Sequence, residues 1–133
     1  MKHTFADSFY LLALFNGSDA AHDRALKASA QLEGILVTTD WVLAETADAL
    51  CDPLNRVRCV EFLDDLRRSA RVAVEPASRT SFDAGLKLYR ERPDKEWSLT
   101  DCISFVVMQN RSISDALSGD HYFEQAGIRA ILK

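Results

Sequence analysis

Four acidic residues that lie far apart in the sequence are the side chains best suited to joint chemistry: Asp7, Glu45, Asp101 and Asp120. Carboxylates that converge in a partly desolvated cleft repel one another, so a cation must offset the cost. Because the candidate donors are all oxygens, with no paired His or Cys, Mg²⁺ or Mn²⁺ suits such a site better than Zn²⁺. Phosphoryl transfer is the chemistry that uses sites of this kind.

The elements that must position these acids follow from the hydrophobic pattern. Short apolar runs alternate with longer segments of helical period, which predicts an α/β fold with a mainly parallel central sheet. Strands are expected at 3–6, 35–38, 72–74, 115–117 and 128–132. Helices are expected at 8–16, 20–32, 41–50, 55–68 and 78–91, then in a buried helix with the body 102–109, and in a turn at 120–125. No linker or repeat interrupts residues 1–133, which indicates a single domain.

In open parallel sheets, ligands gather beyond the carboxyl ends of the strands, where the strand order reverses. Asp7 directly follows the first expected strand, and Asp120 follows the strand at 115–117. Asp101 starts the buried helix, and Glu45 projects from the first turns of the helix at 41–50. The four acids are therefore candidates for one shared site.

Each acid also has a structural explanation that local sequence leaves open. Asp7 could cap the following helix, and Asp101 could complete a capping box with Ser98. Asp120 could be a turn residue beside a glycine. Glu45 is the hardest to explain as scaffold, because it lies past the first turn among apolar residues, where an unpaired buried carboxylate would be costly.

Composition limits how a polyanion could bind. The formal net charge is −4, so bulk electrostatics would repel a nucleic acid, and contact must come from bound cations or local basic patches. Two clusters could contact phosphates or could simply be solvated helix ends: Arg67, Arg68 and Arg71, and Arg90, Arg92 and Lys95.

Other features exclude several classes of protein. The three cysteines form no CxxC pair, which argues against a disulfide framework or a zinc site. No stretch approaches the roughly 18 apolar residues that cross a bilayer, and the N-terminal segment lacks a cleavage site. We therefore expect a cytoplasmic protein without a membrane association.

Four segments, in their order and spacing, resemble the PIN-domain nucleases, particularly the VapC-type toxins of bacterial toxin–antitoxin pairs. They are FADSFYLLALFN, TTDWVLAETADAL, WSLTDCISFVVMQ and DALSGDHYFEQAGI, and together they span nearly the whole chain. The pair SLTDCISFVVM and ALSGDHYFEQAGI is the most specific part. The resemblance implies a three-layer α/β/α domain and a metal-dependent ribonuclease.

The family's acids fall on the four named above, and the resemblance implies that Asp7, Asp101 and Asp120 hold Mg²⁺ or Mn²⁺. It implies supporting hydrogen bonds from polar neighbours of the acids: Ser8, Thr100 and Ser104. The substrate implied is single-stranded or loop RNA. The chain departs from the family where ADSF lacks a threonine after the aspartate and where Gly119 replaces a larger residue, but neither departure removes a carboxylate.

The resemblance also implies partners. A cognate antitoxin would cover the cleft, and the toxin itself would form a homodimer. We expect the antitoxin to dock in an apolar groove between the helices at 20–32 and 55–68.

Three other functions remain open at this stage. The chain could be a housekeeping PIN ribonuclease, or a non-catalytic PIN-like scaffold that binds RNA or a protein. It could also be a receiver-like or haloacid-dehalogenase-like phosphotransferase, although no acid lies two residues after Asp7 and Lys133 is the sole lysine near the end of a late strand.

Overall fold

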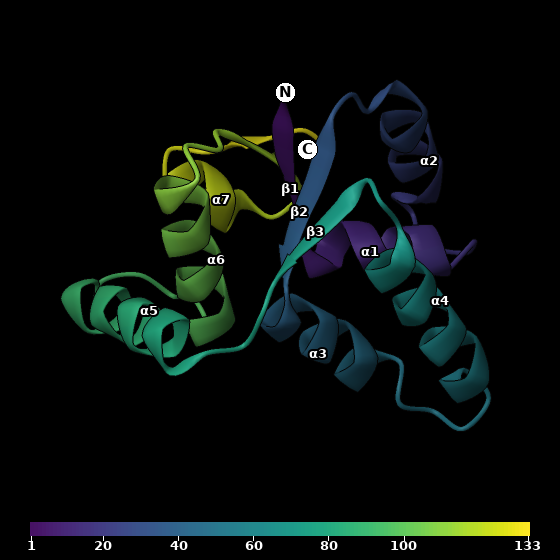
Figure 1. The fold of residues 1–133 in the computed structure, drawn as a ribbon, viewed down its shortest axis with the longest axis horizontal. Helices are drawn as coiled ribbons and strands as arrows, with labels where there is room; N and C mark the ends of the chain where they lie inside the picture. Colours follow the sequence, from purple (N-terminus) through teal and green to yellow (C-terminus); the bar gives the residue numbers. More distant parts are fainter.

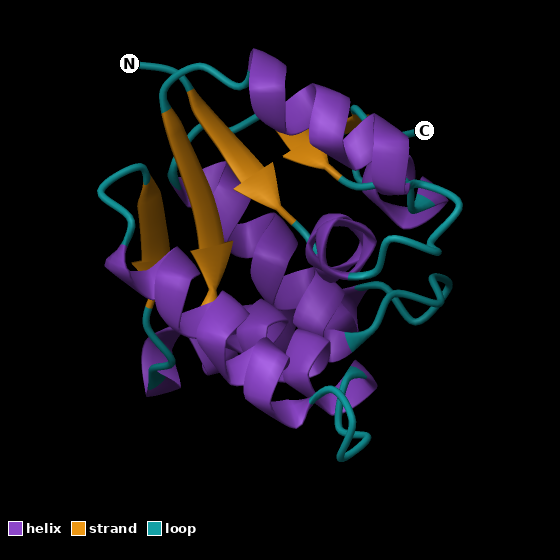
Figure 2. Cartoon of the chain, turned by 90° about the vertical axis from the view of Figure 1, so that its right-hand side faces the viewer, coloured by secondary structure: helices purple, strands orange, loops and turns teal.

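The computed structural model describes residues 1–133 and contains one parallel sheet with the strand order β3-β2-β1-β4-β5. Figure 2 shows the strand arrows pointing toward the same end of the molecule. The strands are β1 (His3–Ala6), β2 (Ile35–Thr39), β3 (Val72–Glu75), β4 (Asp115–Leu117) and β5 (Arg129–Ala130). The predicted bounds differ from these by no more than two residues at either end.

The strand order creates a switch point beside β1. The chain first builds outward from β1 to β2 and β3, then crosses back to add β4 on the other side of β1. The pairs Phe5↔Ala116 and Ala6↔Leu117 join β1 to β4 in register. The residues that follow these two strands therefore emerge side by side, at the place where open parallel sheets bind ligands.

Helices cover both faces of the sheet, as Figure 1 shows: α1, α2 and α4 lie on one side, α5, α6 and α7 lie on the other, and α3 lies beyond the carboxyl ends of the strands. The bounds are α1 (Ser8–Phe15), α2 (His22–Gln31), α3 (Asp40–Ala49), α4 (Arg56–Arg68), α5 (Arg79–Glu91), α6 (Leu99–Asn110) and α7 (His121–Gln125). The predicted three-layer α/β/α fold is confirmed. None of these helices is long and apolar enough to cross a membrane.

Helix α6 is buried along most of its length, as its apolar sequence predicts. Cys102, Ile103, Phe105 and Met108 belong to the main hydrophobic cluster. Gly85 lets α5 pack closely against α6, because a Cβ there would lie 2.2 Å from Cγ1 of Ile103. This close packing fixes the N-terminal half of α6, which carries Asp101.

The predicted apolar face of α4 is partly wrong. Val57, Val60, Leu63 and Leu66 lie near helical spacing in the sequence, which predicts that they form one apolar face. Val57 and Val60 are instead 72% and 58% exposed. Cys59 is buried, and Phe62, Leu63 and Leu66 pack against the core. The buried face of α4 therefore runs through positions 59, 62, 63 and 66, which is a regular helical spacing. The pattern is hard to recognise in the sequence because its first member is a cysteine rather than an aliphatic residue.

Candidate active site

Asp7 lies at the N-cap position of α1, but its side chain makes no capping hydrogen bond. Instead, Oδ2 accepts a hydrogen bond of 2.9 Å from the Oγ of Ser118, the residue that follows β4. Asp7 is only 4% exposed. The pKa of Asp7 is raised to about 7, chiefly by burial and also by the nearby charges of Asp101 and Glu45, while the hydrogen bond from Ser118 opposes the change. Asp7 therefore occupies a capping position, but its side chain bonds to Ser118 instead of capping α1.

Asp101 does form the capping box that the sequence suggested. Its backbone N–H donates to Ser98 Oγ at 3.0 Å, and its Oδ2 accepts from the Ser98 backbone N–H at 3.2 Å. The pKa of Asp101 is nevertheless raised to about 6, chiefly by burial and also by the charges of Asp120 and Glu45. The capping role and a role in the acidic site therefore coexist in one side chain.

Glu45 lies half-buried on α3 and faces the start of α1. Its Oε1 accepts a hydrogen bond of 2.5 Å from the Oγ of Ser8. Ser8 is the first residue of α1, directly after Asp7. This bond holds the Glu45 carboxylate against the segment that carries Asp7.

Asp120 caps the short helix α7. Its Oδ1 accepts from the backbone N–H of Tyr122 at 2.9 Å, and the Nδ1 of the exposed His121 lies 3.6 Å from the same oxygen. Its own backbone N–H donates to the Oγ of Ser118 at 3.0 Å. The turn interpretation is thus correct for its backbone, while its charge also acts on Asp101.

The structure brings the four predicted acids together at the carboxyl end of the sheet. The charges of Asp101 and Glu45 raise the pKa of Asp7, and the charges of Glu45 and Asp120 raise the pKa of Asp101. No lysine or arginine forms an ion pair with any of the four. Mutual repulsion is therefore left uncompensated by the protein itself.

Ser118 is a site residue that sequence reasoning missed. Its fully buried hydroxyl donates to Asp7 and accepts from the backbone of Asp120, so it links two of the acids. The signal that could have found it is its position, since it follows β4 just as Asp7 follows the neighbouring strand β1.

The other two polar candidates lie on α6 near Asp101. Thr100 is half-buried in the first turn, directly before Asp101. Ser104 is buried one turn later, and its Oγ has no hydrogen-bond partner. An unpaired buried hydroxyl is unfavourable, so Ser104 has an unused donor and acceptor on the face that it shares with Asp101.

The donors present fit a hard divalent cation better than any other group. They are carboxylates and hydroxyls with no compensating positive charge, and the unpaired Ser104 hydroxyl lies one turn from Asp101. As the side chains stand, no three acidic, histidine or cysteine groups are arranged to hold a metal ion.

Comparison with known proteins agrees with this geometry. The PIN domain family model matches residues 4–128 of the chain. Two relatives, the 23S rRNA-specific endonuclease VapC20 of Mycobacterium tuberculosis strains CDC 1551 / Oshkosh and ATCC 25618 / H37Rv, are each 28% identical over 123 residues, which cover 92% of this chain and 93% of the relative.

A solved structure has the same fold. The crystal structure of M. tuberculosis VapC20, described as a sarcin–ricin loop cleaving toxin, superposes with a TM-score of 0.86 at 27% identity. The match covers 94% of this chain and 95% of VapC20. Matched along nearly its whole length, this chain belongs to the PIN domain family.

Proposed function

We propose that this protein is a metal-dependent endoribonuclease of the VapC type. The observation that carries the proposal is the set of four carboxylates, without a basic partner from Lys or Arg, at the β1/β4 switch point of a PIN-family chain. Keeping buried, unpaired acids is costly for a scaffold. In a cation-dependent active site, these acids would act as metal ligands.

Asp7, Asp101 and Asp120 would hold Mg²⁺ or Mn²⁺. Such an ion, when bound, lowers the pKa of a water and offsets negative charge on the scissile phosphate. Glu45, held by the hydroxyl of Ser8, is placed to orient the attacking water. Ser118 keeps Asp7 and the backbone of Asp120 at a fixed separation.

The named relatives suggest the biological role. We propose a toxin that acts in the cytoplasm on ribosomal RNA, with the sarcin–ricin loop of 23S rRNA as the first target to test. The test incubates the protein with ribosomes in Mg²⁺ or Mn²⁺ and maps cleavage by primer extension. A single cut that EDTA and Asp7→Asn both abolish is expected. Absence of cleavage in ribosomes and in total RNA would contradict the nuclease proposal.

We also propose that an antitoxin docks over α2 and α4. Both helices carry exposed apolar side chains, Leu26 on α2 and Val57 and Val60 on α4. A short reading frame beside the gene should encode a protein that copurifies with this chain and blocks its activity. Val57→Asp with Val60→Asp should prevent copurification without lowering RNA cleavage, and retained copurification would place the antitoxin elsewhere.

The homodimer is part of the same proposal. Size-exclusion chromatography with light scattering should give twice the monomer mass of 14.9 kDa. A mass equal to that of one chain at micromolar concentration would contradict it.

A further inference from the structure

The C-terminal end of α5 and the loop leading to α6 enclose a hollow of about 700 Å³. Its lining combines cationic and aromatic side chains with the residue that caps α6. The residues used below are Tyr89, Arg90, Arg92, Lys95, Trp97 and Ser98, and we call this region the α5–α6 hollow.

Two of the three cations in the hollow are free to bind a ligand. Arg92 is engaged, because it donates to both carboxylate oxygens of Asp94 at 3.0 and 2.9 Å and lies over the ring of Trp97. That pairing holds the loop in place. Arg90 and Lys95 form no ion pair with any carboxylate, and Lys95 lies 6.0 Å from the centre of the Trp97 ring.

Two acids lie near these cations: Asp94 pairs with Arg92 and is also close enough to Lys95 for their charges to interact, and Glu96 lies in the lining itself. Glu96 is the one acidic residue of the lining, and its carboxylate accepts a hydrogen bond from the hydroxyl of Tyr122 at 3.1 Å. In a chain with a net charge of −4, a hollow with an excess of cations is a local exception. Such a patch attracts a polyanion that the rest of the surface would repel.

Tyr89 adds a surface that charge alone does not require. It is 49% exposed, and it is the one aromatic residue among the large apolar side chains with the most exposure. An exposed ring beside free cations is the combination on which unpaired bases stack while the backbone phosphates are neutralised.

The α5–α6 hollow adjoins the acidic site through Ser98. Ser98 lines one end of the hollow and forms the capping box with Asp101. Glu96 is tied to Tyr122, whose backbone N–H is capped by Asp120. The hollow therefore borders the acidic site at Ser98 and Glu96.

We propose that the α5–α6 hollow binds the single-stranded RNA that flanks the cleaved phosphate, with Arg90 and Lys95 on the phosphates and Tyr89 against a base. The inference rests on the proposed function for the identity of the ligand. An acidic peptide would satisfy the cations but would gain nothing specific from the exposed ring. RNA uses both features.

The experiment measures binding without cleavage. In the Asp7→Asn background with Mg²⁺, fluorescence anisotropy follows a labelled single-stranded RNA of mixed sequence. Arg90→Ala with Lys95→Ala should weaken binding about tenfold and reduce the slope of log affinity against log salt by about 1.4, the loss of two phosphate contacts. Tyr89→Ala should weaken binding roughly tenfold with an unchanged salt slope, and Tyr89→Phe should restore it.

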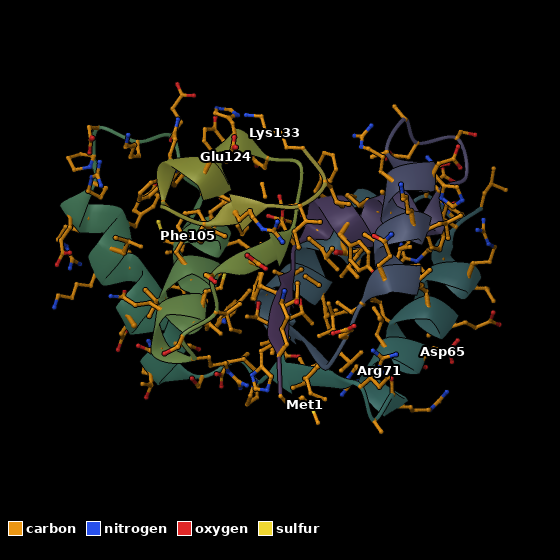
Figure 3. All side chains as sticks on the ribbon, turned by 90° about the horizontal axis from the view of Figure 1, so that it is seen from above. Met1, Asp65, Arg71, Phe105, Glu124 and Lys133 are labelled. Carbon is orange, nitrogen blue, oxygen red and sulfur yellow. The ribbon has the colours of Figure 1, made fainter.

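The matched control removes the same charge elsewhere. Arg67 and Arg68 lie at the end of α4, and Figure 3 shows the flanking Asp65 and Arg71 at the opposite end of the molecule from α5. Arg67→Ala with Arg68→Ala should change affinity less than twofold. Equal losses in both double variants would overturn the inference, and so would displacement of RNA by polyglutamate at the same charge concentration.

The two proposals fail separately. If the wild-type protein cleaves RNA but the hollow variants bind as tightly as their Asp7→Asn parent, this inference is wrong and the nuclease stands. If the wild-type protein cleaves no RNA and the hollow variants still lose binding, the nuclease proposal is wrong and the hollow remains an RNA-binding site.

Discussion

The aspartates at the amino and carboxyl ends of the central strands lie in opposite electrostatic environments. At the amino end, Asp115 begins β4 and meets Lys2 at 3.1 Å and Arg129 at 3.1 Å. The hydrogen bond from Arg129 lowers the pKa of Asp115, with Lys2 adding to the effect. At the carboxyl end, the pKa of Asp7 is raised to about 7, chiefly by burial and also by the acids around it.

The contrast separates acids that serve the fold from acids that serve a ligand. The charge of Asp115 is balanced within the chain by two cations, Lys2 and Arg129. Asp7 and its neighbours have no Lys or Arg partner: hydroxyl and backbone N–H donors contact the carboxylates, and an exposed histidine lies beside Asp120. Keeping carboxylates without a Lys or Arg partner lowers the stability of the free protein, and perturbed acids of this kind are characteristic of functional sites.

The largest expected effect is on catalysis. Asp101→Asn keeps the capping box but removes a charge from the proposed metal site, so kcat for RNA cleavage should fall at least about 100-fold. Asp115→Asn, at the other edge of the sheet, should change kcat less than about twofold. Single-turnover cleavage assays on both variants measure the difference, and comparable losses would break the distinction between the two edges.

A tenfold effect is expected from the hydroxyl that holds Asp7. Ser118→Ala removes the hydrogen bond to Asp7 Oδ2, so the affinity for Mn²⁺ should fall about tenfold, as for other groups that orient metal ligands. Isothermal titration calorimetry measures the affinity. Ser114→Ala, an exposed serine just before the amino end of β4, is the control and should bind Mn²⁺ like the wild type.

The raised pKa of Asp7 should also make the free energy of unfolding of the metal-free protein depend on pH. The pKa of Asp7 is raised to about 7 from 3.8, so the folded state binds more protons than the unfolded state between these values. The free energy of unfolding should therefore fall as pH rises from about 4 to about 7.

Asp7→Asn removes that penalty, so it should raise the free energy of unfolding at pH 8 by about 2–4 kcal/mol. Urea unfolding in EDTA at several pH values measures it. A variant that is less stable than the wild type at pH 8 would show that the Asp7 carboxylate has a compensating partner in the free protein.

The sequence predicted the fold and the four acids for a simple reason. Strand ends and helix starts are encoded locally by period and by turn residues, and Asp7, Asp101 and Asp120 lie at such boundaries. Glu45 was recognisable because it lies in an apolar helix turn.

What sequence could not give depends on contacts across the chain. Whether Asp7 caps α1 or points to Ser118 is decided by a bond between residues 111 positions apart. Local propensity favours both conformations, so only the pairing of β1 with β4 settles it. The buried face of α4 was misassigned for a related reason, because valines at 57 and 60 look more core-like than Cys59 until the position of the sheet is known.

The smallest expected effect concerns the paired aspartate and has the opposite sign. Asp115→Asn removes a carboxylate that two mostly exposed cations contact, so it should lower the free energy of unfolding at pH 7 by about 0.5–1 kcal/mol. The pKa of Asp115 is lowered in the folded state, so its contribution is present above the unfolded value of about 3.9 and is lost as pH falls below it. The wild type and Asp115→Asn should therefore converge in acid, whereas Asp7→Asn should differ most from the wild type in alkali. Because exposed charges are screened, 1 M salt should also reduce the Asp115 effect while leaving the cost of burying Asp7 largely in place.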